Sequence, residues 1–539
     1  MPDATLRAAD ILARRLYEAG CRHAFGMPGG EVLTIVDALE KAGIRFTLTR
    51  HENAAGFIAE GVHHRDGAPA ILVATLGPGA LNAVNVVANA HQDRVPMILL
   101  TGCVDADEAL TYTHQVLDHQ AVFRPVTKAS FRLTAEGADI IADRAVTEAM
   151  APRPGPVHID VPIGVADAQV AAPKPRRRTP ASPVAPQGGD LARAKEWLAG
   201  AERPLAIVGL DMLSGDGDCV LRAFLEHFGI PFITTYKAKG VIGEDHPLCL
   251  GGAGLSPLAD RHLLPLVAQA DLILCLGYDP IEMRTGWREA WDPAHQKVID
   301  IAPVQNDHYM HQAGLSFVAH PGATLEALAQ GSKARSTWPG QEPQAVRAAL
   351  ASAFPLDEDW GPAAVIAEAR AVLPPETLAS ADSGAHRILL SQMWVCPEPR
   401  ALVQSSGLCT MGCAVPLAIG MKFAAPDRPV VSFSGDAGFL MVAGELATAA
   451  EMGTPVIFVV FADASLALIE KKQRERQLSS VGVDFAPSDF AAIGRAFGGA
   501  GESVRNRAEM RAALTAALAR DTFTVISAQI DRGGYDGRI

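Results

Sequence analysis

Short, uninterrupted apolar segments recur along the whole 539-residue chain, and each leads into a turn of small residues and then an alanine-rich stretch of helical length. The segments at 70–74, 205–208 and 456–461 are apolar at every position. Such strands are typical of parallel sheets, because helices there cover both faces of the sheet. The alternation therefore predicts an α/β fold built from parallel sheets.

Two segments interrupt this pattern. The stretch 166–190 is rich in proline, arginine and small residues, as exposed linkers are, and a second break lies at 332–359. Because the chain is too long for a single domain, we expect three doubly wound, mainly parallel-sheet domains at residues 1–165, 190–330 and 360–539. The three arginines at 176–178 are interpreted as part of a solvated linker.

Charge and composition restrict the partners of the chain. Lys and Arg total 47 against 60 Asp and Glu, a net charge of −13, which argues against the basic face that nucleic-acid binding needs. The N-terminus does not resemble a signal peptide, and the longest apolar stretch is too short to span a bilayer. Eight scattered cysteines do not indicate a disulfide framework. We therefore expect a cytoplasmic protein with no nucleic-acid or membrane partner.

Two aspartates follow successive apolar strands in the third block. Asp436 precedes the small residues Ala437 and Gly438, and Asp463 ends the next apolar run. One strand–helix–strand unit of about 30 residues returns a chain to the same edge of a parallel sheet, so both carboxylates can lie at one rim. Oxygen ligands there suit a Mg²⁺ ion that bridges to a diphosphate, with the backbone carbonyl of Ser465 as a third ligand. The alternative is two unrelated strand-end carboxylates, and an unpaired carboxylate after so apolar a strand would be costly.

The first block has two further candidate features. Glu52 stands between a strand-like segment and an alanine-rich helix, where it is either a favourable N-terminal helix carboxylate or a proton-relay group. The turn Gly77-Pro78-Gly79 lies between a strand and a helix, and its glycines allow the backbone to approach a flat ligand closely.

Together these motifs resemble those of the thiamine-diphosphate enzymes of the acetolactate synthase superfamily. The resemblance rests on Arg50-His51-Glu52, the segments 76–82 and 407–412, and the pair Asp436 and Asp463, which occur in the family's order along nearly the whole chain. The stretches 114–130 and 276–283 resemble the catabolic acetolactate synthases, which use no FAD.

The resemblance implies a role for each motif residue. Glu52 would hydrogen-bond N1′ of the aminopyrimidine and so promote removal of the thiazolium C2 proton, and Met411 would hold the cofactor bent. Gln115 and His114 would orient a substrate carbonyl or carboxylate. Ala385 stands where the family usually has Gln, and Glu470 lies one position beyond the catalytic glutamate of the pyruvate decarboxylases and is given no role.

The other implied contacts are to the metal and the cofactor. The metal ligands are Asp436, Asp463 and Ser465. The cofactor contacts are Gly29, Pro78, Asn82, Gly384, His386, Gly407, Leu408, Met411, Gly435, Ala437, Gly438, Leu468 and Ile469.

The implied activity depends on thiamine diphosphate and Mg²⁺, with no FAD. A 2-oxo acid such as pyruvate is decarboxylated and its two-carbon fragment is joined to a second carbonyl, as in acetolactate synthase, a transferase or lyase reaction. One alternative is a decarboxylase or a carboligase or lyase for another 2-oxo acid, a hydroxyketone or a 2-hydroxyacyl-CoA; another is an inactive, cofactor-binding regulatory homologue. In the family the cofactor lies between two chains, so we expect a homodimer or homotetramer with the active site at the dimer interface.

Overall fold

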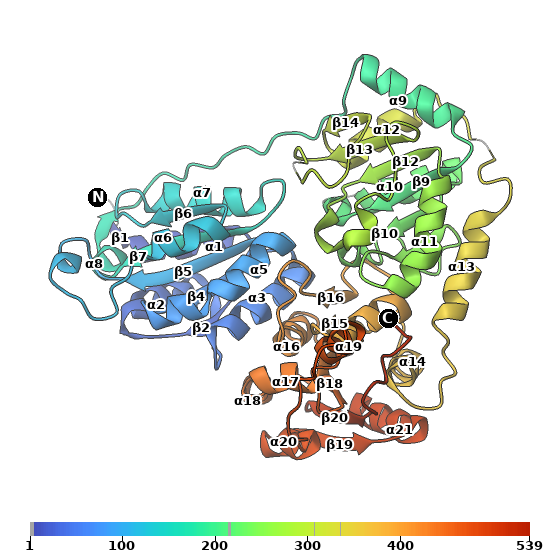
Figure 1. The fold of residues 1–539 in the computed structure, drawn as a ribbon. Helices are drawn as coiled ribbons and strands as arrows, with labels where there is room; N and C mark the ends of the chain where they lie inside the picture. Colours follow the sequence, from blue (N-terminus) through green and yellow to red (C-terminus); the bar gives the residue numbers. More distant parts are fainter. Residues whose placement is uncertain (1–4, 214–216, 307, 335) are drawn as a thin grey trace.

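The computed structural model describes residues 5–213, 217–306, 308–334 and 336–539. Three six-stranded sheets, each parallel throughout, follow one another along the chain and are flanked by helices (Figure 1). A short antiparallel pair of strands, β1 (Thr5–Arg7) and β8 (Gln169–Ala171), adjoins the first sheet's domain. The predicted fold class is therefore confirmed.

The N-terminal and C-terminal sheets share one topology. The first has the order β3-β2-β4-β5-β7-β6 and the last the order β16-β15-β17-β18-β20-β19, which is the same arrangement when strands are counted within each domain. The strands of the first sheet are β2 (His23–Met27), β3 (Arg45–Leu48), β4 (Ala70–Ala74), β5 (Met97–Cys103), β6 (Ala129–Arg132) and β7 (Pro156–Pro162). Those of the last are β15 (Leu378–Ala381), β16 (Leu402–Gln404), β17 (Val430–Gly435), β18 (Ile457–Ala462), β19 (Ala500–Val504) and β20 (Thr524–Gln529).

The central sheet has a different order, β11-β10-β9-β12-β13-β14, which is the order of dinucleotide-binding sheets. Its strands are β9 (Pro204–Val208), β10 (Phe232–Thr234), β11 (Cys249–Gly252), β12 (Leu272–Leu276), β13 (Lys297–Ala302) and β14 (Leu315–Val318). Ligands of such sheets bind where the strand order reverses, here between β9 and β12. In this chain the guanidinium of Arg94, from the N-terminal domain, occupies that position and pairs with Asp211 and Asp279.

Helices cover both faces of the sheets (Figure 1). In the N-terminal domain they are α1 (Ala8–Glu18), α2 (Leu33–Ala42), α3 (Glu52–Asp66), α4 (Pro78–Asn82), α5 (Val84–Asp93), α6 (His119–Phe123), α7 (Ala138–Met150) and α8 (Ile163–Asp167). The central domain and the segment after it contribute α9 (Gly189–Gly200), α10 (Gly217–Phe228), α11 (Pro257–Gln269), α12 (Pro321–Ala329) and α13 (Glu342–Ala353). The C-terminal domain has α14 (Pro362–Val372), α15 (Ala385–Met393), α16 (Ala414–Ala424), α17 (Asp436–Val442), α18 (Glu445–Met452), α19 (Ala467–Glu475), α20 (Phe490–Ala496) and α21 (Arg507–Leu518).

The linker between β8 and α9 is attached to the N-terminal domain by its arginines. Arg177 forms ion pairs with Glu18 at 2.7 Å and Asp139 at 2.8 Å. The run 176–178 is exposed, as expected of a solvated linker, and the ion pairs of Arg177 are an additional feature that the sequence did not predict. Within the described ranges no helix is long and apolar enough to cross a bilayer, and none of the eight cysteines forms a disulfide.

The two outer domains contact each other where α3 crosses α16. A Cβ on Gly420 would lie 2.0 Å from the carbonyl oxygen of Ile58, and one on Gly61 would lie 2.3 Å from that of Leu417. Only glycine permits such an approach, so the helix backbones meet with no side chain between them. Because α3 begins at Glu52 and α16 begins just after Met411, this crossing also fixes two predicted site residues relative to each other.

We predict that Gly420→Ala destabilises the protein. The added methyl group meets rigid backbone, and overpacking of this kind typically costs about 1–3 kcal/mol. Gly200→Ala is the matched control, because a Cβ at this last residue of α9 would meet no atom within 4 Å. Thermal unfolding should show a lower midpoint for Gly420→Ala alone, and equal midpoints for the two variants would contradict the close crossing.

Candidate active site

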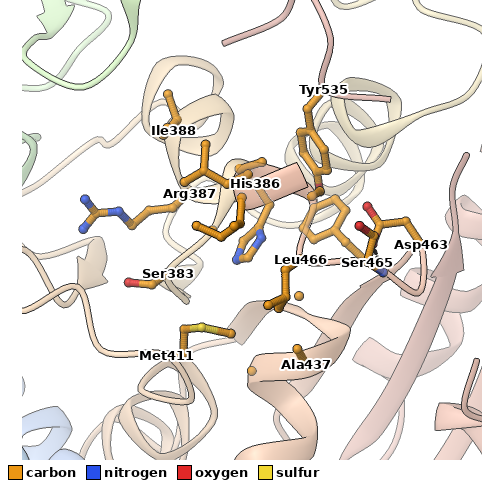
Figure 2. A pocket seen from close by; sticks show the side chains of 18 of the residues that line it. Ser383, His386, Arg387, Ile388, Met411, Ala437, Asp463, Ser465, Leu466 and Tyr535 are labelled. Carbon is orange, nitrogen blue, oxygen red and sulfur yellow. Dashed lines mark hydrogen bonds between the residues drawn. The ribbon is translucent and has the colours of Figure 1, made fainter. Parts of the chain in front are cut away.

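A cavity of about 420 Å³ lies at the C-terminal ends of β17 and β18 (Figure 2). Its walls come from the loops after β15, β17 and β18, the loop before α16, and two central-domain residues, Leu255 and Arg284. The structure brings most of the predicted C-terminal residues together around it: Gly384, His386, Met411, Gly435, Asp436, Ala437, Gly438, Asp463, Ser465, Leu468 and Ile469.

Asp436 and Asp463 lie side by side at one end of this cavity. Asp436 accepts hydrogen bonds from the N–H groups of Ala437 at 2.8 Å and Ala464 at 2.7 Å, and also from that of Asp463 itself at 3.2 Å. The bond from Ala464 stabilises a left-handed conformation, φ 54°, that is costly for a residue other than glycine. The two aspartates and the turn after β18 therefore form one local structure.

The aspartate pair has the donors that Mg²⁺ prefers. Burial and the neighbouring Asp436 charge raise the pKa of Asp463 to about 7, and burial raises the pKa of Asp436. In the described part of the chain no group of three or more His, Cys, Asp or Glu side chains could hold a metal. A metal here would bind both carboxylates, and its other oxygen ligands would be the Ser465 carbonyl, a bound anion and water.

The lining of the same cavity includes polar atoms without partners. The Ser383 hydroxyl and Nε2 of His386 are buried and make no hydrogen bond. Burial lowers the pKa of His386 to about 3, so its ring is neutral. A Cβ on Gly384 would lie 2.5 Å from this imidazole and one on Gly435 would lie 3.2 Å from it. Buried polar atoms normally have partners, so these two fit the oxygens of a bound anion such as a diphosphate.

Asp382 holds the floor of the cavity in place. Its buried carboxylate accepts hydrogen bonds from the N–H groups of Gly412 at 2.8 Å and Cys413 at 3.2 Å, just after Met411. A Cβ on Gly438 would lie 1.9 Å from the same carboxylate. Met411 and the first turn of α17 are thus positioned by one buried group, whose pKa burial raises to about 6.

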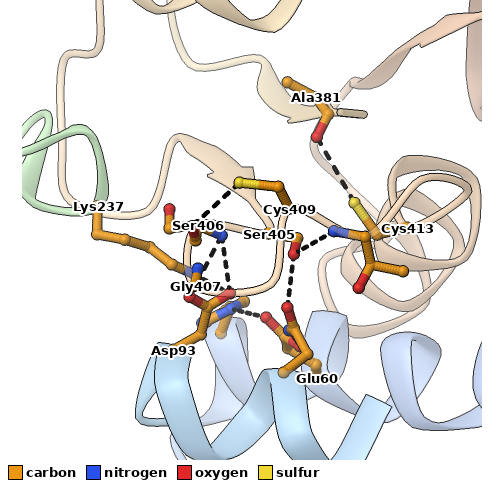
Figure 3. A network of polar contacts seen from close by, with 12 residues as sticks. Glu60, Asp93, Lys237, Ala381, Ser405, Ser406, Gly407, Cys409 and Cys413 are labelled. Atoms are coloured by element: carbon orange, nitrogen blue, oxygen red, sulfur yellow. Dashed lines mark hydrogen bonds and ion pairs between the residues drawn. The ribbon is translucent and has the colours of Figure 1, made fainter. Parts of the chain in front are cut away.

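The loop that carries Met411 is held by residues of all three domains (Figure 3). Asp93 of α5 accepts hydrogen bonds from the N–H groups of Ser406 at 3.1 Å and Gly407 at 2.9 Å, and Lys237 of the central domain lies 3.2 Å from Asp93. Burial raises the pKa of Asp93, and the positive charge of Lys237 opposes that rise. Gly407 and Leu408 belong to this loop and do not line the cavity.

The predicted residues of the N-terminal domain form a second cluster. The buried Glu52 begins α3 and accepts a hydrogen bond from the side-chain amide of Asn82 at 3.0 Å. A Cβ on Gly79 would lie 3.1 Å from the Glu52 carboxylate, and one on Gly29 would lie 2.3 Å from the hydroxyl of Thr75. Pro78 begins α4 between them.

Two polar residues of this cluster, Glu31 and Thr75, were not predicted as site residues. Thr75 donates a hydrogen bond to Glu31 at 2.7 Å beside Gly29. The signal that could have located Thr75 is its place after the apolar strand 70–74, next to the Gly77-Pro78-Gly79 turn. His114 and Gln115 lie on an exposed loop, and Gln115 adopts a left-handed conformation, φ 59°.

The chain therefore holds two separate groups of predicted site residues. None of Gly29, Glu52, Pro78, Asn82, His114 and Gln115 lines the cavity that contains Asp436 and Asp463. Exposed apolar side chains accompany each group. Leu81 and Leu110 are 49% and 84% exposed in the N-terminal domain, and Leu440 and Met441 of α17 are 41% and 62% exposed.

Comparison with known proteins gives a consistent result. Three domain families match the chain: the N-terminal TPP binding domain of thiamine pyrophosphate enzymes at residues 6–122, their central domain at 191–328, and their C-terminal TPP binding domain at 382–528. The chain is 28% identical to an acetolactate synthase of Bacillus subtilis, over 97% of this chain and 93% of that protein. It is 28% identical to a catabolic acetolactate synthase of Raoultella terrigena (97% and 95%) and 31% identical to a probable 2-ketoarginine decarboxylase of Pseudomonas aeruginosa (97% and 94%).

We predict that Asp93 and Lys237 are energetically coupled. The test is a double-mutant cycle of Asp93→Asn and Lys237→Met. Each single change leaves a buried charge without this partner, so the two single losses in unfolding free energy should add up to more than the loss in the double variant. The expected difference is about 1 kcal/mol or more. The exposed pair Asp37 and Lys41 is the control, with an expected coupling of about 0.3–0.5 kcal/mol. Equal coupling in both cycles, measured by urea unfolding, would contradict a structural role for the buried pair.

Proposed function

The chain belongs to the thiamine pyrophosphate enzymes of the acetolactate synthase superfamily, and on that premise we propose that it decarboxylates pyruvate and joins the two-carbon fragment to a second 2-oxo acid. The observation that carries the proposal is that one cavity is lined by two strand-end carboxylates, by unpartnered buried polar atoms of Ser383 and His386, and by Met411. That arrangement fits a metal-bound diphosphate with a ring resting on Met411.

We assign the binding of the cofactor as follows. Asp436, Asp463 and the carbonyl of Ser465 would hold Mg²⁺ against the diphosphate. Ser383 and His386 would bond the phosphate oxygens, and Met411 would support the bent cofactor. When bound, thiamine diphosphate supplies a carbanion at C2 that adds to a 2-oxo acid and takes up the electrons released by decarboxylation.

Glu52 is assigned to proton transfer. It is buried, and Asn82 bonds only one of its two oxygens, so the other is available to N1′ of the cofactor. A carboxylate held in this way can share a proton at N1′ and so govern the basicity of the neighbouring amino group. His114 and Gln115 would orient the substrate from their exposed loop.

The side chains that line the cavity favour a small anionic substrate. Arg284 and Lys472 line it, and neither side chain forms a hydrogen bond or ion pair with another described residue. Leu468 and Ile469 provide an apolar surface beside them. This charge suits the carboxylate of pyruvate and would repel the guanidinium group of 2-ketoarginine.

We propose that the working unit is a dimer, alone or within a tetramer. In this proposal the Glu52 cluster of one chain meets the cavity of the other, and the exposed Leu81, Leu110, Leu440 and Met441 are covered by the contact. Apolar side chains exposed beside two incomplete sites are typical of an interface. We also propose that no FAD is used, since Arg94 pairs with Asp211 and Asp279 at the reversal of strand order, where a dinucleotide would bind the central sheet.

Two observations favour an alternative reaction. The similarity to a 2-ketoarginine decarboxylase favours a decarboxylase without carboligation. The central domain also has a cavity of about 330 Å³, lined by Tyr278, Trp291 and Asp300, where the nucleotide of a CoA substrate could bind. In that case ADP or CoA would raise the unfolding temperature of the protein.

A product assay tests the proposal. Purified protein is incubated with pyruvate, thiamine diphosphate and Mg²⁺, and in parallel with 2-ketoarginine. Acetolactate from pyruvate is the expected product. Acetaldehyde alone, or turnover of 2-ketoarginine alone, would replace the proposal with the decarboxylase.

We predict that Glu52→Gln lowers kcat by about 10²–10⁴-fold, because the amide cannot share the proton at N1′. Affinity for thiamine diphosphate should change less than kcat, because the residues assigned to the metal and the diphosphate all line the other cavity and are unaltered. Glu342→Gln is the control, because Glu342 is likewise the first residue of a helix, α13, and lies in another part of the fold.

The direct readout is exchange of the C2 proton of bound thiamine diphosphate with solvent, measured by quenched-flow NMR. This exchange should slow in Glu52→Gln and stay at the wild-type rate in Glu342→Gln. Unchanged exchange in Glu52→Gln would refute the assigned role.

A further inference from the structure

The turn beside Glu52 begins with an unusual backbone conformation. Gly77 has φ 64° and ψ −110°, a combination that L-residues rarely adopt. Its N–H is buried and donates a hydrogen bond to Nε2 of His119 at 3.1 Å. Because this nitrogen accepts, it carries no proton, and the ring proton lies on Nδ1.

The other side of the imidazole is held by Asp160. Nδ1 of His119 donates to this carboxylate at 2.9 Å, and the hydroxyl of Thr101 donates to the same oxygen at 2.8 Å. His119 is 1% exposed and Asp160 is 3% exposed, so water does not compete for these bonds. Burial raises the pKa of Asp160, but the hydrogen bonds from His119 and Thr101 oppose this effect and the pKa is lowered overall. Asp160 is therefore a carboxylate, and it keeps the His119 proton on Nδ1.

The turn connects this dyad to Glu52. The carbonyl of Gly77 accepts a hydrogen bond from the N–H of Leu81 at 3.0 Å, which closes α4. The next residue, Asn82, donates to Glu52, and Gly79 lies against the same carboxylate. A displacement of Gly77 would therefore move Gly79 and Asn82, which both lie against Glu52.

The same residue also borders the substrate loop. A Cβ on Gly77 would lie 3.0 Å from Cβ of Gln115, and His119 begins α6 only four positions further along. His114, which the resemblance assigns to the substrate, is exposed and forms no comparable contact.

We propose that His119, with its tautomer set by Asp160, is a positioning residue that holds the Gly77 amide and thereby orients Asn82 and Glu52. The link to catalysis rests on the proposed function, in which Glu52 is the proton-relay group. The link to the Gly77 turn does not, and it can be tested without cofactor.

The first experiment measures amide hydrogen exchange of the segment 75–83 in the cofactor-free protein. His119→Leu removes the acceptor and should accelerate exchange in this segment by about tenfold or more, through local opening of the turn. His119→Gln should restore most of the protection, because its carbonyl can accept from Gly77 while its amide donates to Asp160.

His158→Leu is the matched control. His158 is buried in the same cluster and contacts Thr101 and Ser130, but it makes no bond to the turn. Its replacement should lower overall stability and leave the segment 75–83 protected relative to the rest of the fold. Equal protection of this segment in His119→Leu and wild type would overturn the proposal.

The second experiment separates kcat from KM. His119→Leu should lower kcat for pyruvate by about 10- to 100-fold, as expected for a misplaced catalytic group, with a smaller change in KM, and His119→Gln should recover most of the loss. Full kcat in His119→Leu with a deprotected turn would overturn the link to Glu52. If the wild type turns over no pyruvate, the proposed function fails, while the exchange experiment still decides whether His119 holds the turn.

Discussion

The site depends on the contact between α3 and α16, where Gly61 and Gly420 allow two helix backbones to touch. One helix begins with Glu52 and the other begins immediately after the loop of Met411. A close crossing of two buried helices is stiff, because neither backbone can move without displacing the other. The crossing consequently fixes the position of Glu52 relative to Met411, although the two residues line different surfaces of the same chain.

Buried polar groups continue this arrangement toward the site. Asp93 and Lys237 connect the loop before Met411 to the other two domains, Asp382 fixes its far end, and His119 fixes the turn beside Glu52. Each group would be costly to bury alone and is satisfied by several partners. The atoms left unsatisfied at Ser383 and His386 are therefore informative, because they line the cavity that fits an anion.

Much of this could be predicted from sequence because the signal is local. Apolar strands followed by helices identify a parallel α/β fold, and the position of Asp436 and Asp463 after successive strands anticipates that they lie together. Strand order could not be predicted in this way, since it depends on packing between distant segments. The close approach at Gly61 and Gly420 could not be predicted, because nothing in the sequence distinguishes these glycines from others within helices. His119 was missed because His114, in the motif that resembles the family, drew the substrate assignment. The ion pairs of Arg177 could not be predicted either, because Glu18 and Asp139 are distant from it in sequence.

The central claim is that one active site is built from two chains, with Glu52 from one and the aspartate pair from the other. Mixing Glu52→Gln protein with Asp463→Ala protein under conditions that exchange subunits tests it directly. About half of the dimers should then be mixed, each with one intact site, so activity should rise to roughly a quarter of the wild-type value. If the mixture is no more active than its two parents, the complete site lies within a single chain and the account is wrong.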